Sequence, residues 1–256
     1  MSTLPQFHAD GAPVPSLPAD AAYSGGLLET MRCQRGRVPL WPLHRARLER
    51  SGQIDSATLD TIEAAVSAIA RDCPAEAAKL RLRLGLLEGQ SHWDLALTPL
   101  EPTPELTLGV RLFPCETRLL ASETANPGCK SLQRAGYNRA KGELPQLDRC
   151  DGLLRDDSGR AIESLRCNLL LYRGNRWLTP DLSRCGVRGV MRDWLGARIS
   201  LAGVDVQWQA LLAADEVALC NSVRGVLPVV ELLGERRWAV GPQTRRLQQL
   251  IAEELW

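Results

Sequence analysis

The stretch CKSLQR at residues 129–134 contains a lysine that heads a segment we predict to be helical. A second stretch, IESLRCNLL at residues 162–170, places an acid beside a strand-like run. A third, CGVRGVMR at residues 185–192, is a glycine-spaced loop that leads into another predicted helix. Their order and spacing, rather than any one of them, predict a single cofactor site.

The three stretches supply the groups that pyridoxal phosphate needs from a protein. A neutral lysine amine forms a Schiff base with an aldehyde, and desolvation favours the neutral amine. A carboxylate beside a pyridine nitrogen keeps that nitrogen protonated, so that the ring accepts electrons. Backbone amides at the start of a helix bind a dianionic phosphate. We therefore predict that Lys130 is the catalytic lysine and that Glu163 contacts the pyridine nitrogen.

Lys130 has few rivals, since the chain contains only three lysines. Lys79 flanks a predicted strand, and Lys141 lies on what we predict to be a solvated helix face. The competing interpretations are a surface lysine on a polar helix for Lys130 and a turn-flanking glutamate for Glu163.

Three more stretches extend the pattern: GLLETMR at residues 26–32, HRARLERS at 44–51 and ADEVALCNSVRGVLPV at 214–229. With them the sequence resembles the class IV aminotransferase family, the fold-type IV enzymes that use pyridoxal phosphate. The resemblance spans most of residues 22–232. Within the family the chain is most similar to the 4-amino-4-deoxychorismate lyase branch, through residues 186–192 and 214–229.

This resemblance implies how the phosphate of the cofactor is bound. The backbone amides of Val190 and Met191 and the hydroxyl of Ser222 are expected to hold it. Arg47 is expected to add a charge-assisted hydrogen bond. The competing interpretation of Arg47 is a solvated arginine on a helix that also carries Arg45 and Arg50.

The resemblance says less about the substrate. Arg134 stands where several aminotransferases of the family carry a tyrosine, and the lyase branch is similar to this chain in having an arginine there. Arg134 is therefore a candidate for contact with the cofactor's phenolic oxygen or with a substrate carboxylate, and the alternative is an ordinary helix arginine. Thr30 and Arg32, near the expected edge of the cofactor, are weaker candidates for substrate contacts.

Two segments depart from the family pattern. Members usually have a tyrosine-glycine-acid-glycine turn where this chain has YSGG at residues 23–26. Many lyases have a glycine- and arginine-rich loop where this chain has EGQSHW at residues 88–93. Both departures concern the expected substrate side, so the cofactor site is better supported than the substrate site.

Composition excludes several classes of function. The chain has 45% hydrophobic and 24% charged residues and a net charge of +1, which gives no reason to expect nucleic-acid or membrane partners. Its eight cysteines include no pair at two-residue spacing and there are only three histidines, so no metal site is expected. We expect a cytoplasmic protein with free thiols, because residues 1–20 lack a signal peptide; disulfides are the alternative.

Periodicity predicts the main elements. We expect helices at residues 42–51, 57–73, 130–144, 187–201 and after Gly241-Pro242, and strands at 80–86, 93–98, 106–113, 152–155, 167–172, 204–208 and 216–220.

The resemblance implies an α+β / α/β chain of two domains, a fold-type IV pyridoxal-phosphate enzyme that is D-amino acid aminotransferase-like. We expect a smaller N-terminal α/β domain at residues 1–113, an interdomain connection at 114–118 and a larger C-terminal α/β domain at 119–256. The larger domain should carry most of the cofactor site. A homodimer is expected because family members are homodimers.

The implied reaction converts a small-molecule substrate, 4-amino-4-deoxychorismate, to 4-aminobenzoate and pyruvate, a step of folate biosynthesis. The alternative is a class IV aminotransferase that acts on D-amino or branched-chain amino acids. A further alternative is a protein that binds pyridoxal phosphate without catalysis.

Overall fold

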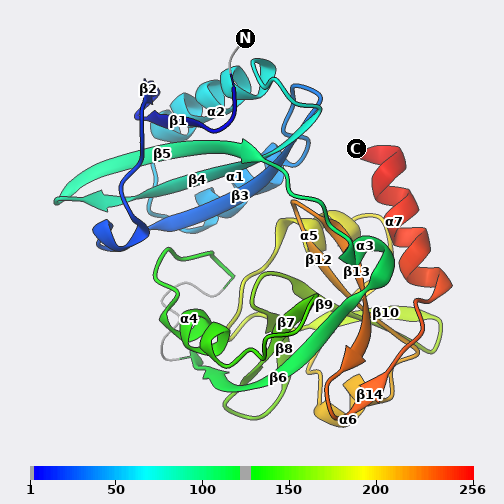
Figure 1. Ribbon diagram of the computed structural model, residues 1–256. Coiled ribbons are helices and arrows are strands. Elements are labelled where there is room, and N and C mark those ends of the chain that lie inside the picture. Colours follow the sequence, from blue (N-terminus) through cyan, green and yellow to red (C-terminus); the bar gives the residue numbers. More distant parts are fainter. Residues whose placement is uncertain (1–2, 122–127) are drawn as a thin grey trace. The chain divides into compact units, whose positions relative to one another are not determined.

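Residues 3–121 and 128–256 are described by the computed structural model, and they divide into two units (Figure 1). The N-terminal unit holds the described residues up to 102 together with 129–133. The C-terminal unit holds the remaining described residues. The short segment 129–133, which includes Lys130, is thus enclosed in sequence by residues of the other unit.

The N-terminal unit is built on an antiparallel sheet with the strand order β2-β1-β5-β4-β3. Its strands are β1 (Gln6–Ala9), β2 (Ala12–Val14), β3 (Leu27–Gln34), β4 (Ala77–Leu87) and β5 (Gln90–Pro99). Alternation along β4 assigns its residues to two faces: Leu80 and Leu82 are buried in the core, and Arg81 and Arg83 lie on the opposite face.

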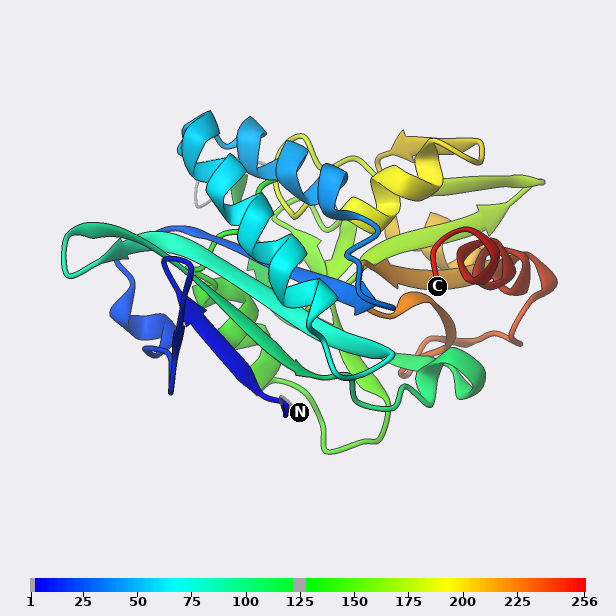
Figure 2. The same ribbon diagram turned by 90° about the horizontal axis from the view of Figure 1, so that it is seen from above.

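Two helices, α1 (Trp41–Arg50) and α2 (Ser56–Arg71), cover the core face of this sheet (Figure 2). Asp55 caps α2, because its carboxylate accepts a hydrogen bond from the amide of Thr58. The core joins the apolar stripes of both helices to the sheet and includes Leu48, Leu59, Ile62, Val66, Met31, Leu80, Leu82 and Leu95. A short 3-10 helix, η1 (Asp20–Ala22), precedes β3.

The C-terminal unit contains a nine-stranded sheet in which β8 pairs with both β7 and β9. The strands β9, β12, β13, β6, β7 and β8 therefore form a closed ring. The strands are β6 (Val110–Leu119), β7 (Cys150–Asp156), β8 (Ala161–Ser164), β9 (Asn168–Arg173), β10 (Arg176–Pro180), β11 (Leu201–Val204), β12 (Glu216–Asn221), β13 (Gly225–Leu232) and β14 (Arg236–Arg237).

The helices of the C-terminal unit are α3 (Glu105–Leu108), α4 (Ala135–Gly142), α5 (Val190–Gly196), α6 (Trp208–Leu212) and α7 (Pro242–Glu254). Helix α7 packs against β12 and β13, and the buried carboxylate of Glu216 on β12 caps it. That carboxylate accepts hydrogen bonds from the amides of Gln243 and Thr244. Because a helix N-terminus leaves its first amides without partners, this contact fixes α7 to the sheet.

Most predicted elements are present, and the helix predicted at 42–51 matches α1 to within one residue. The strand predicted at 106–113 is wrong at its start. Residues 105–108 form α3. Gly109, with a φ of 79°, ends this helix before β6 begins. Strand β6 then continues to Leu119, so the predicted connection at 114–118 lies inside a strand. A register shift between Pro114 and Arg118 accommodates the proline, which lacks an amide hydrogen.

Three further predictions need correction. The helix predicted at 130–144 begins only at Ala135, because residues 130–132 use their backbone groups to pair with the edge of β3. The helix predicted at 187–201 is limited to α5, and the strand predicted at 204–208 is displaced to β11, which α6 follows. Strand β8 was not predicted, and it carries Glu163.

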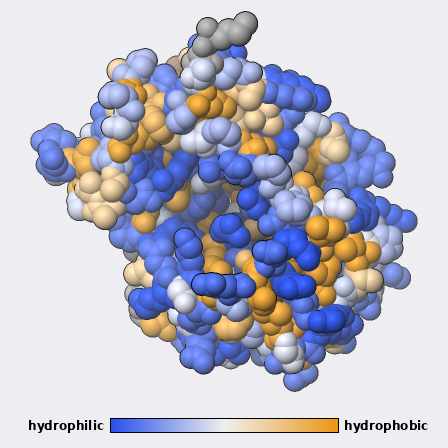
Figure 3. Space-filling model, in the orientation of Figure 1, coloured by the Kyte–Doolittle hydropathy of each residue, from blue (hydrophilic) through white to orange (hydrophobic). Residues whose placement is uncertain are grey.

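On the face that Figure 3 shows, hydrophilic residues surround smaller groups of hydrophobic ones. The large exposed hydrophobic residues among those described are Leu86, Leu108 and Leu147. Within the described ranges, no helix combines the length and the apolar character required to cross a membrane. All eight cysteines lie in the described part of the chain, and all are free thiols.

Candidate active site

Lys130 lies beside the edge of β3 rather than at the head of a helix. Its carbonyl accepts a hydrogen bond from the amide of Leu28 at 2.8 Å, and Leu132 donates to the carbonyl of Gly26 at 2.9 Å. Its side-chain Nζ donates a hydrogen bond to the hydroxyl of Thr30 at 3.2 Å, and both side chains are half-buried. The structure thus brings together two residues that the sequence analysis selected for different roles.

Arg47 is a buried residue of α1, which excludes the interpretation of a solvated helix arginine. Its Nε donates to Oε1 of Glu29 at 2.7 Å, and its Nη2 donates to the other carboxylate oxygen. His44, also buried, lies with its Nδ1 2.6 Å from Oε2 of Glu29. Burial raises the pKa of Glu29, but the charges of Arg47 and His44 outweigh burial and lower this pKa to about 2. Glu29 therefore holds the guanidinium of Arg47 in one orientation.

Arg32 follows on the same strand as Thr30 and Glu29. Its Nε donates to Oε1 of Gln34 at 2.8 Å, and burial lowers the pKa of the guanidinium. Because side chains alternate along a strand, Arg32 and Thr30 share the face opposite to Glu29. This face also carries Lys79, Arg81 and Arg83 of the neighbouring strand, since Lys79 pairs with Arg32 and Arg81 pairs with Thr30.

Glu163 is buried in β8, where donors from three other segments of the C-terminal unit contact its carboxylate. The amide of Val187 donates to Oε1 at 3.1 Å, and Nδ2 of Asn168 donates to Oε2 at 3.2 Å. The hydroxyl of Tyr137 donates to Oε1 as well. These contacts exclude a turn-flanking glutamate on the surface. Tyr137 was missed by the sequence analysis, because nothing in its helix spacing points to a residue 26 positions away.

The glycines of the third stretch pack tightly against the residues around Glu163. A Cβ atom on Gly186 would lie 2.8 Å from Ile162 and 3.4 Å from Oε1 of Glu163, and its φ of 88° also favours glycine. A Cβ atom on Gly189 would lie 1.9 Å from Oδ1 of Asn168. Glycine is therefore required at both positions, and the loop is held against the strand that carries the acid.

Helix α5 begins directly after this loop. Gly189 occupies its N-cap and has no side chain that could accept from the first helical amides, so these amides suit an external anion. The amides of Val190 and Met191 belong to this first turn. The donor set therefore fits the phosphate of the predicted cofactor.

Ser222 lies in the turn between β12 and β13, and α5 packs against β12. Asn221 shapes this turn, because its Oδ1 accepts hydrogen bonds from the amides of Val223 and Arg224 at 3.0 and 2.8 Å. Two residues before Ser222, Cys220 pairs across the sheet with Asn168, the residue that contacts Glu163 and Gly189. The C-terminal unit thus gathers Glu163, the start of α5 and the strand leading to Ser222 around Asn168.

Arg134 precedes α4 and lies on Tyr137. Its guanidinium carbon is 3.7 Å from the centre of the tyrosine ring, and its Nη2 donates to the carbonyl of Leu165 at 3.0 Å. Both contacts are within the C-terminal unit, and they fix the side chain beside the acid's hydrogen-bond partner.

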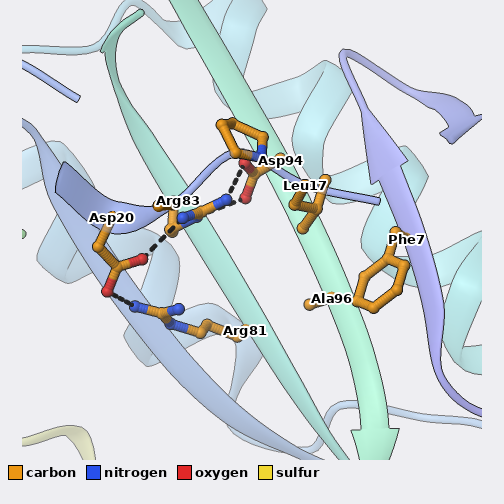
Figure 4. A pocket seen from close by; sticks show the side chains of 9 residues that line it. Phe7, Leu17, Asp20, Arg81, Arg83, Asp94 and Ala96 are labelled. Carbon is orange, nitrogen blue, oxygen red and sulfur yellow. Dashed lines mark hydrogen bonds and ion pairs between the residues drawn. The ribbon is translucent and has the colours of Figure 1, made fainter. Parts of the chain in front are cut away.

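A pocket of about 400 Å³ opens on the N-terminal unit (Figure 4). One wall is apolar, with Phe7 and Leu17, and the other carries Arg81 and Arg83, which are both bound to Asp20. Its lining includes none of the predicted site residues, all of which the structure describes. Since its arginines are already neutralised by Asp20 and Asp94, this pocket is not the predicted phosphate site.

Residues 23–26 lie close to β4, because the amide of Ser24 donates a hydrogen bond to the carbonyl of Leu86 at 2.9 Å. A Cβ atom on Gly26 would lie 2.0 Å from the carbonyl oxygen of Leu84, and one on Gly85 would lie 2.4 Å from the carbonyl oxygen of Gly25. Tyr23 is anchored by its hydroxyl, which donates to Asp94. Gly26 therefore permits the close crossing over β4, whereas a Cβ atom on Gly25 would meet nothing within 4 Å. Packing thus gives no explanation for Ser24 and Gly25, the two residues that differ from the family pattern.

Known proteins resemble this chain over most of its length. The sequence profile of the family described as "Amino-transferase class IV" matches residues 26–232. The chain is 28% identical over 272 residues to the aminodeoxychorismate lyase of Vibrio harveyi, with 96% of each protein covered. It is 34% identical to the crystal structure of 4-amino-4-deoxychorismate lyase from Pseudomonas aeruginosa, with a TM-score of 0.83 over 97% of this chain and 99% of that chain.

A hypothetical aminotransferase from Mycobacterium tuberculosis, in its PLP-bound form, has the same fold, with 18% identity, a TM-score of 0.85 and 98% of each chain covered. These similarities confirm the predicted fold class, the two-domain fold-type IV architecture. The family profile matches well over half of the sequence, including the stretches around Lys130, Glu163 and Gly189. The chain therefore belongs to the class IV aminotransferase family.

Proposed function

We propose that this protein is a pyridoxal-phosphate-dependent lyase that converts 4-amino-4-deoxychorismate to 4-aminobenzoate and pyruvate in folate biosynthesis. The observation that carries the choice of reaction is the similarity, over nearly the whole chain, to the lyases from V. harveyi and P. aeruginosa. The residues themselves support the cofactor, because a lysine, a buried acid and a glycine-capped helix start are each in place.

When bound, pyridoxal phosphate would supply an aldehyde that reacts with amines and a ring that accepts electrons. In this proposal Val190 and Met191 bind its phosphate through their amides, Ser222 through its hydroxyl and Arg47 through its guanidinium. Glu29 orients Arg47 for this contact. Glu163 holds a proton at the ring nitrogen.

Lys130 carries the proton transfers. Its Nζ removes the proton from the amine-bearing carbon of the substrate and then protonates the departing enolpyruvyl oxygen. Thr30 accepts a hydrogen bond from Nζ and so limits the directions in which the amine can point. The bond that breaks joins a ring carbon to the ether oxygen, and the ring becomes aromatic. The amine stays in the product, so the reaction needs no amino acceptor.

The substrate carries two carboxylates, and cationic side chains should meet them. Arg32 is the candidate in the N-terminal unit, because it shares its sheet face with Thr30. Arg134 remains a candidate from the sequence, although its guanidinium already contacts Tyr137 and Leu165.

The second candidate function is an aminotransferase for D-amino or branched-chain amino acids. Membership of the class IV aminotransferase family favours it. Lys130 would then move a proton between two carbons instead of assisting an elimination. The presence of both Lys130 and Glu163 argues against a protein that binds pyridoxal phosphate without catalysis.

One assay separates these functions. Purified protein is given 4-amino-4-deoxychorismate without any amino acceptor, and pyruvate and 4-aminobenzoate are measured over time. A lyase releases equal amounts of both over many turnovers, and Lys130→Ala releases neither. If turnover requires an amino acid together with a keto acid, the lyase proposal is wrong and the family assignment remains.

We further propose that the protein is cytoplasmic and forms a homodimer. Light scattering of the purified protein measures its oligomeric state and so tests the dimer.

A further inference from the structure

Tyr137 connects two residues of the site in the C-terminal unit. It lies in the first turn of α4, and its hydroxyl donates a hydrogen bond to Oε1 of Glu163. The guanidinium of Arg134 stacks on its ring at 3.7 Å from the centre, and Leu165 fixes that guanidinium through its carbonyl. The tyrosine is thus clamped between a cation on its ring and a carboxylate at its hydroxyl.

The hydroxyl of Tyr137 acts as a hydrogen-bond donor to Glu163, because it remains protonated. Burial, and then the charge of Glu163, raise the pKa of Tyr137 well above its usual value. A protonated phenol beside a carboxylate donates to it, and such hydrogen bonds favour the ionised form of the acid. Tyr137 therefore acts with the Val187 amide and the Asn168 side chain, which donate to the same carboxylate.

We propose that Tyr137 is a positioning residue that keeps Glu163 ionised and thereby keeps the proton on the ring nitrogen of the bound cofactor. The inference rests on the proposed function, because it takes Glu163 as the partner of that nitrogen. Without the phenol the carboxylate becomes more basic, and the shared proton moves from the ring nitrogen toward Glu163. Arg134 acts through Tyr137, since the stacked cation strengthens the phenol as a donor.

The test compares Tyr137→Phe with the wild-type holoenzyme, reconstituted with pyridoxal phosphate that is nitrogen-15-labelled in its ring. We expect the ring resonance of Tyr137→Phe to move toward that of an unprotonated pyridine. We also expect kcat to fall about tenfold, the loss of a hydrogen bond to a charged group, with KM little changed. The matched control is Tyr172→Phe, whose hydroxyl contacts Asn175 at the surface, and its resonance should equal that of the wild type.

Two further variants test the role of Tyr137 independently. Arg134→Met should move the resonance in the same direction by a smaller amount, and it serves if Tyr137→Phe does not fold. In a Glu163→Gln background, Tyr137→Phe should have no further effect on the resonance, because the two residues act through one contact. An additional shift in that background contradicts the inference.

The outcomes separate this inference from the proposed function. A protonated nitrogen in the wild type that stays protonated in Tyr137→Phe overturns the role of Tyr137 alone. An equal shift in Tyr172→Phe does the same. An unprotonated nitrogen in the wild type overturns the role of Glu163 and the inference with it. None of these spectra depends on whether the enzyme is a lyase or an aminotransferase.

Discussion

The Nζ atom of Lys130 donates a hydrogen bond to the Thr30 hydroxyl at 3.2 Å, although the two residues are 100 positions apart in the sequence. Thr30 lies within β3, and Lys130 lies in the segment that pairs with the edge of the same strand. The strand thus positions the amine through both its backbone and a side chain. If Lys130 is the catalytic lysine, this contact sets the direction of its proton transfers.

Lys130 is expected to bind the cofactor covalently. The purified protein should absorb in the visible as a protonated Schiff base, and borohydride reduction should fix the cofactor to a peptide that contains Lys130. Lys130→Ala should lose both signals, and Lys141→Ala should keep them. Mass spectrometry that finds the label on Lys79 or Lys141 contradicts the assignment.

Thr30 is expected to affect the rate more than binding. Thr30→Val keeps the side-chain volume but removes the acceptor for Nζ, so kcat should fall about tenfold while cofactor affinity changes little. Thr30→Ser keeps the hydroxyl and should recover most of the rate. Steady-state kinetics of the two variants checks this, and equal rates for them would remove the hydroxyl from the mechanism.

Glu163→Gln is expected to retain the cofactor but to slow proton abstraction, because a neutral amide cannot hold the ring nitrogen in its protonated form. The loss should be smaller for a lyase than for a transaminase, since formation of the aromatic ring adds driving force. Stopped-flow measurement of the first turnover tests the rate. Unchanged turnover in this variant contradicts the role of Glu163.

Arg47 and Ser222 are expected to differ in their contribution to phosphate binding. A hydrogen bond from a charged group contributes about 1.5–3 kcal/mol and a neutral one about 1 kcal/mol, so Arg47→Ala should weaken cofactor binding more than Ser222→Ala. Titration of the apoprotein with pyridoxal phosphate measures both. Because Arg47→Ala also leaves the buried Glu29 without its cation, Arg47→Lys is the control that retains a charge.

The buried cluster of Glu29, His44 and Arg47 should make stability depend on pH. The pKa of Glu29 is about 2 in the folded protein and is expected near 4.5 when the chain unfolds. Its contribution to stability is therefore present above pH 4.5 and is lost as the pH falls toward 2. Urea unfolding should show Glu29→Gln less stable than the wild type at pH 7, and the difference should be smaller at pH 3. An equal difference at both values excludes this linkage.

The sequence was sufficient for the parts of the fold that depend on local pattern. The helices α1 and α2 and the strands β4 and β5 have clear periodicity, and they lie where we predicted them. The start of α4 was misplaced, because residues 130–132 obtain their hydrogen bonds from a strand about 100 residues earlier. Such pairing leaves no periodic signal in the segment itself.

The same distinction applies to the candidate site. Lys130 and Glu163 were selected by residue type and by resemblance, and neither depends on long-range geometry. The contacts of the site residues do depend on long-range geometry: Tyr137 contacts Glu163 from another element, and Glu29 contacts Arg47 from β3. Strand β8 was missed because only four residues form it and its pairing partners, β7 and β9, define it.

The closed ring of strands has a consequence for motion. Strand β8 pairs with β7 over three residue pairs and with β9 through the pair of Glu163 and Asn168, so a shift of Glu163 along the sheet would break contacts on both sides. Segment 129–133 is instead held to β3 at a single edge. Amide hydrogens of β8 should exchange with solvent only through global unfolding, whereas those near Lys130 should exchange through local opening. Glu163 is thus expected to lie in a part of the molecule that opens only on global unfolding, and Lys130 in a part that opens locally.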